Sequence, residues 1–441
     1  MNRYMSMGAI ACAVAMVVAC GDDEALGPGT GGAAGTGGGI GGAAGSGGSG
    51  GSAGSGGTAG SGGTAGSGGS DAGSDADAGV PAGRLLVAGT DFATKTEIAT
   101  IDLETSKVAG SVTVNDGDAV PLASGGQGFV LERTTAKLHH LDATGKIAKT
   151  VDVGKTAVGL SGTGSTNPVG VIASGSKALV VLQDANRVAM VDLTAGSVSK
   201  TIDLAPYLAS GDGDKSVDAT RPVLRSGRAY FLLGRIDRTT IAAPSYQLAC
   251  PSVPALLLAV DLASDSLVDL NGAAAGEGIE LTLANPVDAA LDGNRLLILS
   301  AGCFAAADGG STRTKHGVEA VALDTGVVTT EHAAKNQDFL SRLVVRSSTS
   351  ALLNTFDPSF AEHWYGWTIG QGALGSELTG VPAAASLDDA NHLLGVDIAA
   401  TDAGATVTVV RYDISAQTKT TVVASPWTGS FASAGGTALV R

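Results

Sequence analysis

The chain has 441 residues, only 4% of them aromatic, and a formal net charge of −15 at pH 7. The first 83 residues contain six acidic residues and one arginine, so the rest of the chain carries a formal charge of −10. A negative domain argues against nucleic acid or an anionic membrane surface as the main partner. With so few aromatic residues, the core has to be built from Val, Leu, Ile and Ala.

Residues 1–19 contain one arginine and a mostly apolar run that begins at Met7. This run is too short to span a bilayer as a mature helix, and it is typical of a secretory signal peptide. It ends in Val17-Val18-Ala19-Cys20-Gly21, which resembles a bacterial lipobox, although that motif prefers Leu where Val17 stands. The resemblance implies that Cys20 is acylated, since several acyl chains anchor a protein durably where one is marginal. An ordinary signal peptide with an incidental cysteine is the alternative.

Residues 20–83 are rich in Gly, Ser and Ala, and TAGSGG units repeat between Ser52 and Gly69. Such chains behave as random coil, and a segment of this length has a root-mean-square reach of ~45 Å. We therefore expect a tether in the cell envelope that ends at the lipid on Cys20. Gly21, in place of Asp, favours the outer membrane by the enteric sorting rule, on its periplasmic side or at the cell surface.

The segment Asn167–Leu204 reads as four short strands separated by turns rich in Gly, Ser, Asp and Asn. The expected strands are Val169–Ala173, Lys177–Gln183, Arg187–Leu193 and Ser197–Leu204. Short strands rich in β-branched residues at this spacing, repeated along the chain, predict the blade of a β-propeller.

The third strand of this unit and its turn recur along the chain, each time with an aspartate that can accept hydrogen bonds from its own turn. These aspartates are Asp102, Asp142, Asp192, Asp261, Asp324 and Asp413. The gaps between them are 40, 50, 69, 63 and 89 residues, and the last gap suits two blades. The missing blade is expected from about Asp338 to Leu378. The predicted fold class is therefore all-β: a seven-bladed β-propeller of four-stranded antiparallel blades over residues 84–441.

The first blade lacks an inner strand, because Arg84–Gly89 already resembles the second strand of a blade. The segment Ser430–Val440 resembles an inner strand instead. We therefore expect the C-terminus to close the ring beside the first blade, which removes exposed strand edges.

Residues 84–441 resemble the YVTN-type, surface-layer-like β-propeller repeats of bacterial exported proteins. The best match opens with Pro168-Val169-Gly170-Val171 and has Val191-Asp192-Leu193 in its third strand, while Val180-Val181-Leu182-Gln183 replaces the YVTN tetrapeptide. The resemblance implies the fold and leaves the activity open, because the family is functionally mixed.

Two further cysteines, Cys250 and Cys303, fall between the second and third strands of the fourth and fifth blades. Those connections are neighbours on one face, and disulfides persist in exported proteins, so we expect these cysteines to be paired. Two free thiols are the alternative.

The long connections follow the second or fourth strand of a blade, so they emerge on the same face. They are 159–167, 205–221, 234–253, 271–280 and 301–317. Functional groups concentrate on such loops, and this loop-rich face, mainly over the third to fifth blades, is the expected binding face.

The acidic segment Gly211–Asp218 could hold calcium through Asp212, Asp214 and Asp218, or it could be a solvated loop. Arg235, Asp237 and Arg238 are interpreted as a surface ion-pair group. Trp364, Tyr365 and Trp367 are interpreted as core residues of the sixth blade. No spacing identifies a catalytic group or a cofactor site.

These observations predict an envelope-anchored lipoprotein that acts as a monomer and binds a protein, polysaccharide or small ligand without catalysis. Its other partner is the membrane, through the lipid on Cys20. The alternative is a propeller enzyme, lactonase-like or quinone-dependent dehydrogenase-like, with a site near the central channel. The nearest ionisable cluster for such a site is Asp388, Asp389 and His392, which resembles a turn. A structural spacer is a third hypothesis.

Overall fold

The computed structural model describes residues 83–242, 247–272, 278–305, 312–333, 339–357, 359, 361–401, 404–427 and 433–441. The expected signal peptide, Cys20 and the tether up to residue 82 lie outside the described residues. Within the described part of the chain, no helix has the length and apolar character needed to cross a membrane.

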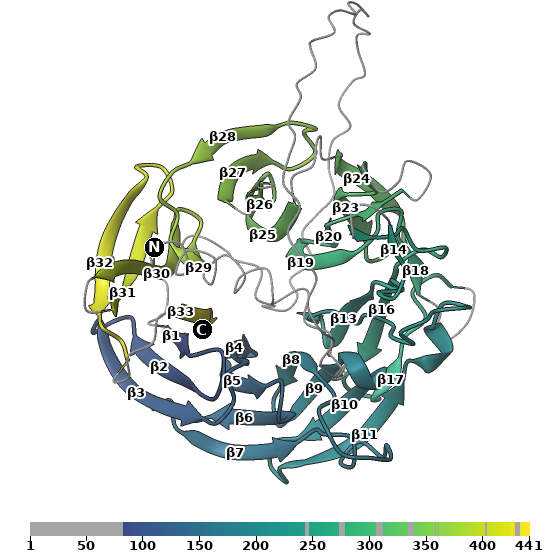
Figure 1. The fold of residues 1–441 in the computed structure, drawn as a ribbon, viewed down its shortest axis with the longest axis horizontal. Coiled ribbons are helices and arrows are strands. Elements are labelled where there is room, and N and C mark those ends of the chain that lie inside the picture. The colour runs from purple at the N-terminus through teal and green to yellow at the C-terminus, as the bar shows by residue number, and fades with distance from the viewer. Residues whose placement is uncertain are drawn as a thin grey trace, which may run out of the picture.

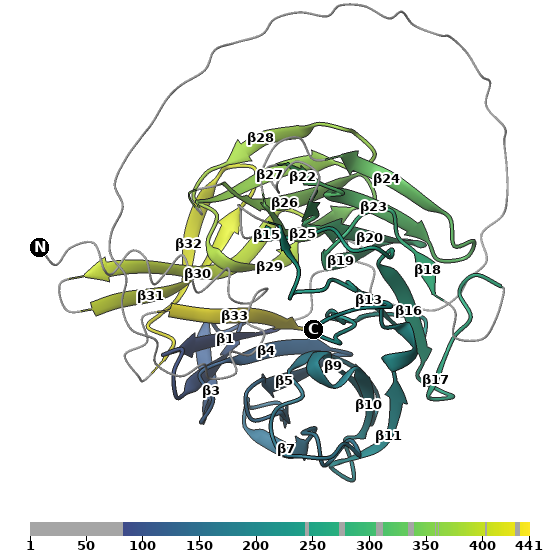
Figure 2. The same ribbon diagram turned by 45° about the vertical axis from the view of Figure 1, so that its right-hand side comes forward.

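Seven antiparallel sheets follow one another around a ring, as Figure 1 and Figure 2 show. Each is one blade with four strands, so the predicted seven-bladed β-propeller is confirmed. The blades begin at the N-terminus and are numbered in chain order, with the strands of each given from the inside outward.

Blade 1 consists of β33 (Ser433–Val440), β1 (Arg84–Thr90), β2 (Thr96–Asp102) and β3 (Lys107–Val114). Blade 2 consists of β4 (Ala119–Ser124), β5 (Gln127–Glu132), β6 (Lys137–Leu141) and β7 (Ile147–Asp152). Blade 3 consists of β8 (Pro168–Ser174), β9 (Lys177–Leu182), β10 (Arg187–Asp192) and β11 (Ser197–Asp203). Blade 4 consists of β12 (Val223–Arg225), β13 (Arg228–Leu233), β16 (Leu256–Asp261) and β17 (Ser266–Leu267), and β18 (Ile279–Glu280) also pairs with β16.

Blade 5 consists of β19 (Pro286–Asp292), β20 (Arg295–Ser300), β23 (Gly317–Ala322) and β24 (Val328–Ala333). Blade 6 consists of β25 (Phe339–Ser347), β26 (Ser350–Phe356), β27 (Glu362–Thr368) and β28 (Leu374–Leu378). Blade 7 consists of β29 (Ala383–Asp389), β30 (His392–Thr401), β31 (Gly404–Asp413) and β32 (Thr418–Ala424). Two short 3₁₀ helices, η1 (Gln183–Ala185) and η2 (Ala205–Tyr207), complete the described helical structure.

The second strand of a blade is buried on both faces because neighbouring blades cover it from either side. In β9, residues 178–182 read ALVVL and are fully buried, the continuous apolar run expected of a strand with no solvent face. The outer strand β11 reads SVSKTID and has a mostly exposed pattern. The core is thus a series of apolar layers between adjacent blades.

The predicted blade from about Asp338 to Leu378 is blade 6. Its Trp364 and Trp367 side chains are only 3% and 2% exposed, so they fill the core where other blades use aliphatic residues. Trp364 packs in the core layer with Leu393 and Tyr412 of blade 7, and Trp367 packs in the layer with Leu297 and Val318 of blade 5. Tyr365 between them is half-buried.

The C-terminal strand closes the ring. Strand β33 pairs with β1 from Arg84↔Val440 to Thr90↔Ser433 and supplies the inner strand of blade 1, which confirms the predicted closure. The buried carboxylate of Asp388 in blade 7 forms ion pairs with both Arg411 and the C-terminal Arg441. The final residue is therefore fixed to the blade that precedes the closure.

The aspartates at the end of the third strands organise their turns as predicted, with one exception. Asp192 accepts hydrogen bonds from the backbone N–H groups of Thr194 (2.8 Å) and Ala195 (2.9 Å). Equivalent bonds are made by Asp102, Asp142, Asp261 and Asp413. The prediction is wrong for Asp324, which accepts no such bond in the described structure. Ala322 ends β23 in its place, and the Ala322 carbonyl accepts from Thr325 and Gly326.

Candidate ligand-binding site at the loop-rich end of the channel

The long connections of blades 4 and 5 each carry a small hairpin. In blade 4 it is formed by β14 (Ile241–Ala242) and β15 (Gln247–Leu248), and in blade 5 by β21 (Cys303–Phe304) and β22 (Arg313–Thr314). A disulfide joins Cys250 to Cys303, with 4.8 Å between their Cα atoms. The backbone N–H of Cys250 also donates to the carbonyl of Phe304 at 3.1 Å. The two connections are therefore linked side by side.

The blade 5 hairpin is held against blade 6 by a guanidinium group. The Arg313 side chain lies over the rings of Phe304 and Phe339, at 5.1 and 4.4 Å from their centroids. Such cation–π contacts fix both ring and cation. Together with the disulfide, this contact ties blades 4, 5 and 6 to one another at the loop-rich face.

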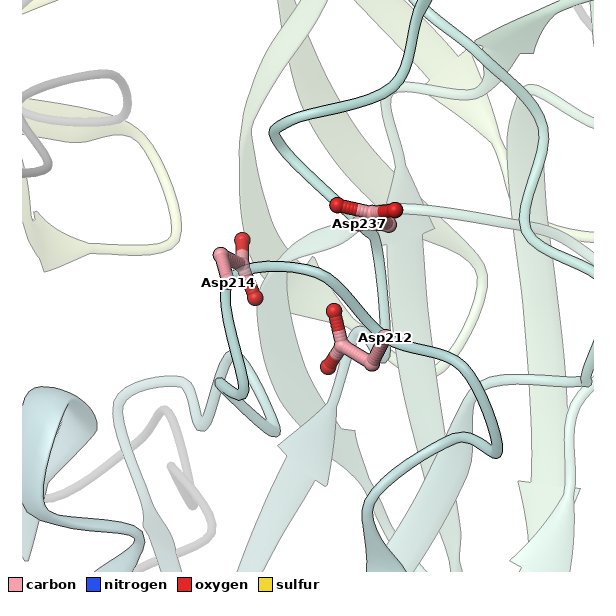
Figure 3. A group of neighbouring side chains, drawn as sticks. All are labelled: Asp212, Asp214 and Asp237. Carbon is pink, nitrogen blue, oxygen red and sulfur yellow. The ribbon is translucent and has the colours of Figure 1, made fainter.

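Three carboxylates meet on this face, as Figure 3 shows. One carboxylate oxygen from each of Asp212, Asp214 and Asp237 lies within 4.8 Å of the other two. Asp212 and Asp214 belong to the connection between η2 and β12, whereas Asp237 follows β13. The structure places Asp218 outside this group, because its carboxylate pairs with Arg238 at 2.8 Å and accepts from the N–H of Ile236.

Two of these three carboxylates are held by hydrogen bonds from the two loops. Asp214 accepts from the N–H groups of Ser216 and Arg238, each at 2.9 Å. Asp237 accepts from the N–H of Thr239 at 2.9 Å and from the hydroxyl of Thr240 at 2.7 Å. The interpretation of Arg235, Asp237 and Arg238 as one ion-pair group is wrong, because Arg238 pairs with Asp218 and Arg235 donates to the carbonyl of Pro254.

Asp212 is the exception. Both of its carboxylate oxygens are buried and accept no hydrogen bond from the described residues. This burial, with Asp214 and Asp237 nearby, raises the pKa of Asp212 to about 6. Burial likewise raises the pKa of Asp218 to about 6 in spite of Arg238, while hydrogen bonds from Thr239 and Thr240 lower the pKa of Asp237 to about 2. Among the described residues, no lysine or arginine forms an ion pair within 4.0 Å with Asp212, Asp214 or Asp237.

Calcium binds six to eight oxygens at roughly 2.3–2.6 Å, so two oxygens on the same ion lie within about 5 Å of each other. The spacing of Asp212, Asp214 and Asp237 meets this condition. These are the described residues that could hold a metal ion on this face.

A second group of charges lies along the inner strands of the ring. The second strands of blades 3, 4 and 5 begin at Lys177, Arg228 and Arg295. Seven residues before these positions lie Gly170, Arg221 and Asp288. In β25 the corresponding residue is Arg342, since this strand contains one more bulge. Gly170, Asp288 and Arg342 each directly follow a bulge in the inner strand, a feature that redirects side chains. These four residues thus share one level in blades 3 to 6.

Asp288 connects this level across two blades. Its Oδ2 accepts from the N–H of Leu343 in blade 6 at 2.8 Å, and its Oδ1 accepts from the N–H of Ala289 at 3.0 Å. Burial raises the pKa of Asp288, an effect that these bonds and the charges of Arg342 and Arg221 oppose. Arg221 is exposed, yet the protein atoms around its guanidinium still lower its pKa by desolvation. Asp288 opposes this, and Arg342 and Arg133 lower the pKa further. The four charged groups are therefore close enough to influence one another.

The three arginines differ in what they contact. Arg133 donates from Nε and Nη2 to Asn167 Oδ1 at 3.2 and 3.0 Å and pairs with Asp118 at 3.2 Å. Arg221 and Arg342 have neither a side-chain hydrogen bond nor an ion pair within 4.0 Å among the described residues. Sequence reasoning missed both residues, because it aligned the third strands of the blades and not the first.

The sequence analysis considered Asp388, Asp389 and His392 for an enzyme site and interpreted them as a turn. The structure gives them structural roles. Asp389 accepts from the N–H of Asn391 and contacts His392 Nδ1, each at 2.8 Å, so these residues form the turn before β30. Asp388 is committed to Arg411 and Arg441 at the ring closure.

No protein-family model and no curated protein matches the chain. Among solved structures, a protein assigned as a 6-phosphogluconolactonase from Bacteroides fragilis is 11% identical, covers 82% of this chain and 99% of its own, and has a TM-score of 0.49. The dihydro-heme d1 dehydrogenase NirN in complex with DHE is 11% identical, with coverages of 82% and 76% and a TM-score of 0.46. AztD from Citrobacter koseri is 12% identical, with coverages of 81% and 98% and a TM-score of 0.41. Likeness at this level concerns the fold alone.

Proposed function

We propose that this protein is an exported, lipid-anchored binding module that holds a ligand at the loop-rich end of its propeller and does not transform it. The observation that carries the proposal is the joining of the blade 4 and blade 5 connections by Cys250–Cys303 at this end of the ring. A binding surface fixed in advance loses less conformational entropy when a ligand binds. The unpaired Arg221 and Arg342 lie near the same end of the inner strands.

The charged groups at this level support binding over catalysis. The groups that interact electrostatically with Arg221 are Arg133, Asp288 and Arg342. Guanidinium groups stay protonated in proteins and donate hydrogen bonds only. Asp288 already accepts two backbone hydrogen bonds, which fix it in place. These groups suit the recognition of a ligand. The three arginines are neither nucleophiles nor bases, and Asp288, whose side-chain type can act as a nucleophile, has both carboxylate oxygens bonded to backbone N–H groups.

The proposal includes the anchoring predicted from the sequence. Cys20 carries the lipid, residues 20–83 form the tether, and the propeller works as a monomer in the cell envelope, at the outer membrane. The six-residue repeats of the tether and the lipobox-like sequence before Cys20 support this part.

Native mass spectrometry of the detergent-extracted full-length protein tests the binding function. The protein is incubated with a defined library of organic acids, sugars, amino acids and nucleotides. We expect a saturable one-to-one complex with at least one compound, which is released unchanged. Conversion of the compound into a product would support the enzyme hypothesis instead, and retention of no compound would contradict small-ligand binding.

We also propose that Asp212, Asp214 and Asp237 hold a cation of the size of calcium. Two observations support this: the mutual spacing of their oxygens, and the buried Asp212 oxygens that accept no hydrogen bond from the described residues. A cation there would interact with the three carboxylates directly and would fix the connection between blades 3 and 4.

A further inference from the structure

We propose that Arg221 and Arg342 bind the carboxylate of a small ligand at the loop-rich end of the inner strands. In this arrangement Asp288, in the blade between them, accepts a hydrogen bond from a hydroxyl or amine of the same ligand. The proposal rests on the binding function proposed above and names the ligand class.

The order of the blades brings the three groups together. Arg221 lies just before the inner strand of blade 4, Asp288 lies in the inner strand of blade 5 and Arg342 lies in that of blade 6. All three are at one level of the ring. The bond from the Leu343 N–H to Asp288 places that carboxylate beside the residue next to Leu343, which is Arg342. The sequence along the ring is therefore cation, anion, cation.

Gly170 makes room for Arg221 on the other side. A Cβ atom at position 170 would lie 2.9 Å from Arg221 Cγ and 2.4 Å from Pro222 Cδ. Both distances are shorter than real Cβ contacts, so a side chain at this level of blade 3 would displace the stem of Arg221. The absence of a side chain at Gly170 thus fixes where Arg221 runs.

The two guanidinium groups have unused hydrogen-bonding capacity. Each guanidinium carries five N–H donors in a planar fork that matches a carboxylate, and neither Arg221 nor Arg342 donates to another described residue. Asp288 uses one bond on each oxygen, and each oxygen has a second lone pair to offer. An oxygen-rich ligand can therefore be bound without breaking any bond of the free protein.

Charge favours a carboxylate over a phosphate. Arg133 is paired with Asp118, and Glu362, which interacts with Arg342, accepts hydrogen bonds from Asn354 and Trp364. The remaining Arg221, Arg342 and Asp288 give a local charge of +1, which a monoanion neutralises. A phosphate dianion would leave an excess negative charge next to the half-buried Asp288 carboxylate, and like charges repel. The ligand class is accordingly a small carboxylate with a neighbouring hydroxyl or amine, such as a hydroxy acid.

Saturation-transfer NMR and calorimetry with the full-length protein at neutral pH test this inference. The probes are D-gluconate, glucose as its uncharged counterpart, and inorganic phosphate. We expect gluconate to bind saturably and in preference to glucose and phosphate. Arg221→Met and Arg342→Met should each weaken gluconate binding about tenfold or more, the loss expected for a charge-assisted hydrogen-bond pair.

Arg225→Met is the matched control, because Arg225 ends the inner strand β12, four residues after Arg221, and donates to Asn294. It should leave gluconate binding unchanged. Asp288→Asn raises the local charge and should shift the preference toward phosphate. Thermal unfolding of each variant checks the fold. Gly170→Ala changes neither arginine in the sequence and should weaken gluconate binding by displacing Arg221.

Equal gluconate binding by the wild type and both methionine variants would overturn this inference and leave the proposed binding function intact. Tighter binding of phosphate than of gluconate by the wild type would overturn the carboxylate assignment. If gluconate fails to bind, the inference fails, and the library experiment decides the proposed function separately.

Discussion

A single aspartate ends the third strand of most blades, and its carboxylate holds the turn that follows. The Asp192 carboxylate accepts hydrogen bonds from two backbone N–H groups. Asp192→Ala should lower the free energy of unfolding by about 0.5–1.5 kcal/mol, the usual net value of such hydrogen bonds. Urea denaturation measures the change. Asp324→Ala is the control, since Asp324 makes no turn bond in the described structure, and an equal loss in both variants would contradict this role.

Asp212 links the acidic loop to pH. Its pKa is raised from 3.8 to about 6, so the folded protein holds this proton more tightly than the unfolded chain does. The resulting stability is complete below the unfolded pKa and is lost as the pH rises through the folded one. The raised pKa of Asp218 has the same effect on stability. The pKa of Asp237 is lowered to about 2, so its stabilising contribution is present above the unfolded pKa and is lost as the pH falls toward 2.

In the presence of a chelator, the melting temperature should therefore fall between pH 4 and pH 7, and Asp212→Asn should reduce this fall. At neutral pH the variant should melt about 1–2 °C above the wild type, the effect of roughly 1 kcal/mol in a domain of this size. Millimolar calcium should raise the melting temperature of the wild type and not that of Asp212→Asn. Differential scanning calorimetry measures both. Equal responses to calcium would contradict a site at Asp212.

At the residue scale, the sequence indicated an acidic loop and could not identify its third member. Asp212, Asp214 and Asp218 are neighbours in sequence, but Asp218 turns toward Arg238. Asp237 joins the group from another connection, after β13. Which side chains of two irregular loops meet depends on the tertiary path of each loop, and no local pattern encodes that path.

The element that fixes the loop-rich face is the pair of hairpins joined by Cys250–Cys303, which are 53 residues apart in sequence. The chain-entropy estimate for a loop of this length is about 4 kcal/mol. The double variant Cys250→Ala, Cys303→Ala should lose up to this amount of unfolding free energy. Denaturation of the wild type with and without a reductant is the matched measurement. An unchanged stability on reduction would contradict a bond that constrains the unfolded chain.

The strands of the ring were predictable where repetition was strong. The third strands and their turns gave the blade count, and the long gap after Asp324 contained blade 6. The first strands repeat as well, as Asn167-Pro168-Val169-Gly170 and Asn285-Pro286-Val287-Asp288. Both asparagines have positive φ, 46° and 56°, a conformation asparagine tolerates. Aligning these strands would have placed Asp288 on an inner strand at the level of Gly170, which the third strands cannot do because they lie farther from the ring axis.

For the whole molecule, the anchoring proposal predicts that Cys20→Ser releases the protein from membranes. The thioether-linked lipid is the only attachment proposed, and a negatively charged propeller is repelled by anionic lipid. Fractionation of cells that express each form, with immunoblotting, measures this. Membrane association of Cys20→Ser equal to that of the wild type would contradict lipid anchoring at this cysteine.

The most direct test of a ligand at the loop-rich end is hydrogen–deuterium exchange of the full-length protein with and without a compound that it retains. We predict protection in the connection 205–222 and in the inner strands β19 and β25, around Arg221, Asp288 and Arg342. Protection confined to the turns at the other end of the ring, such as the one between β8 and β9, would contradict the account.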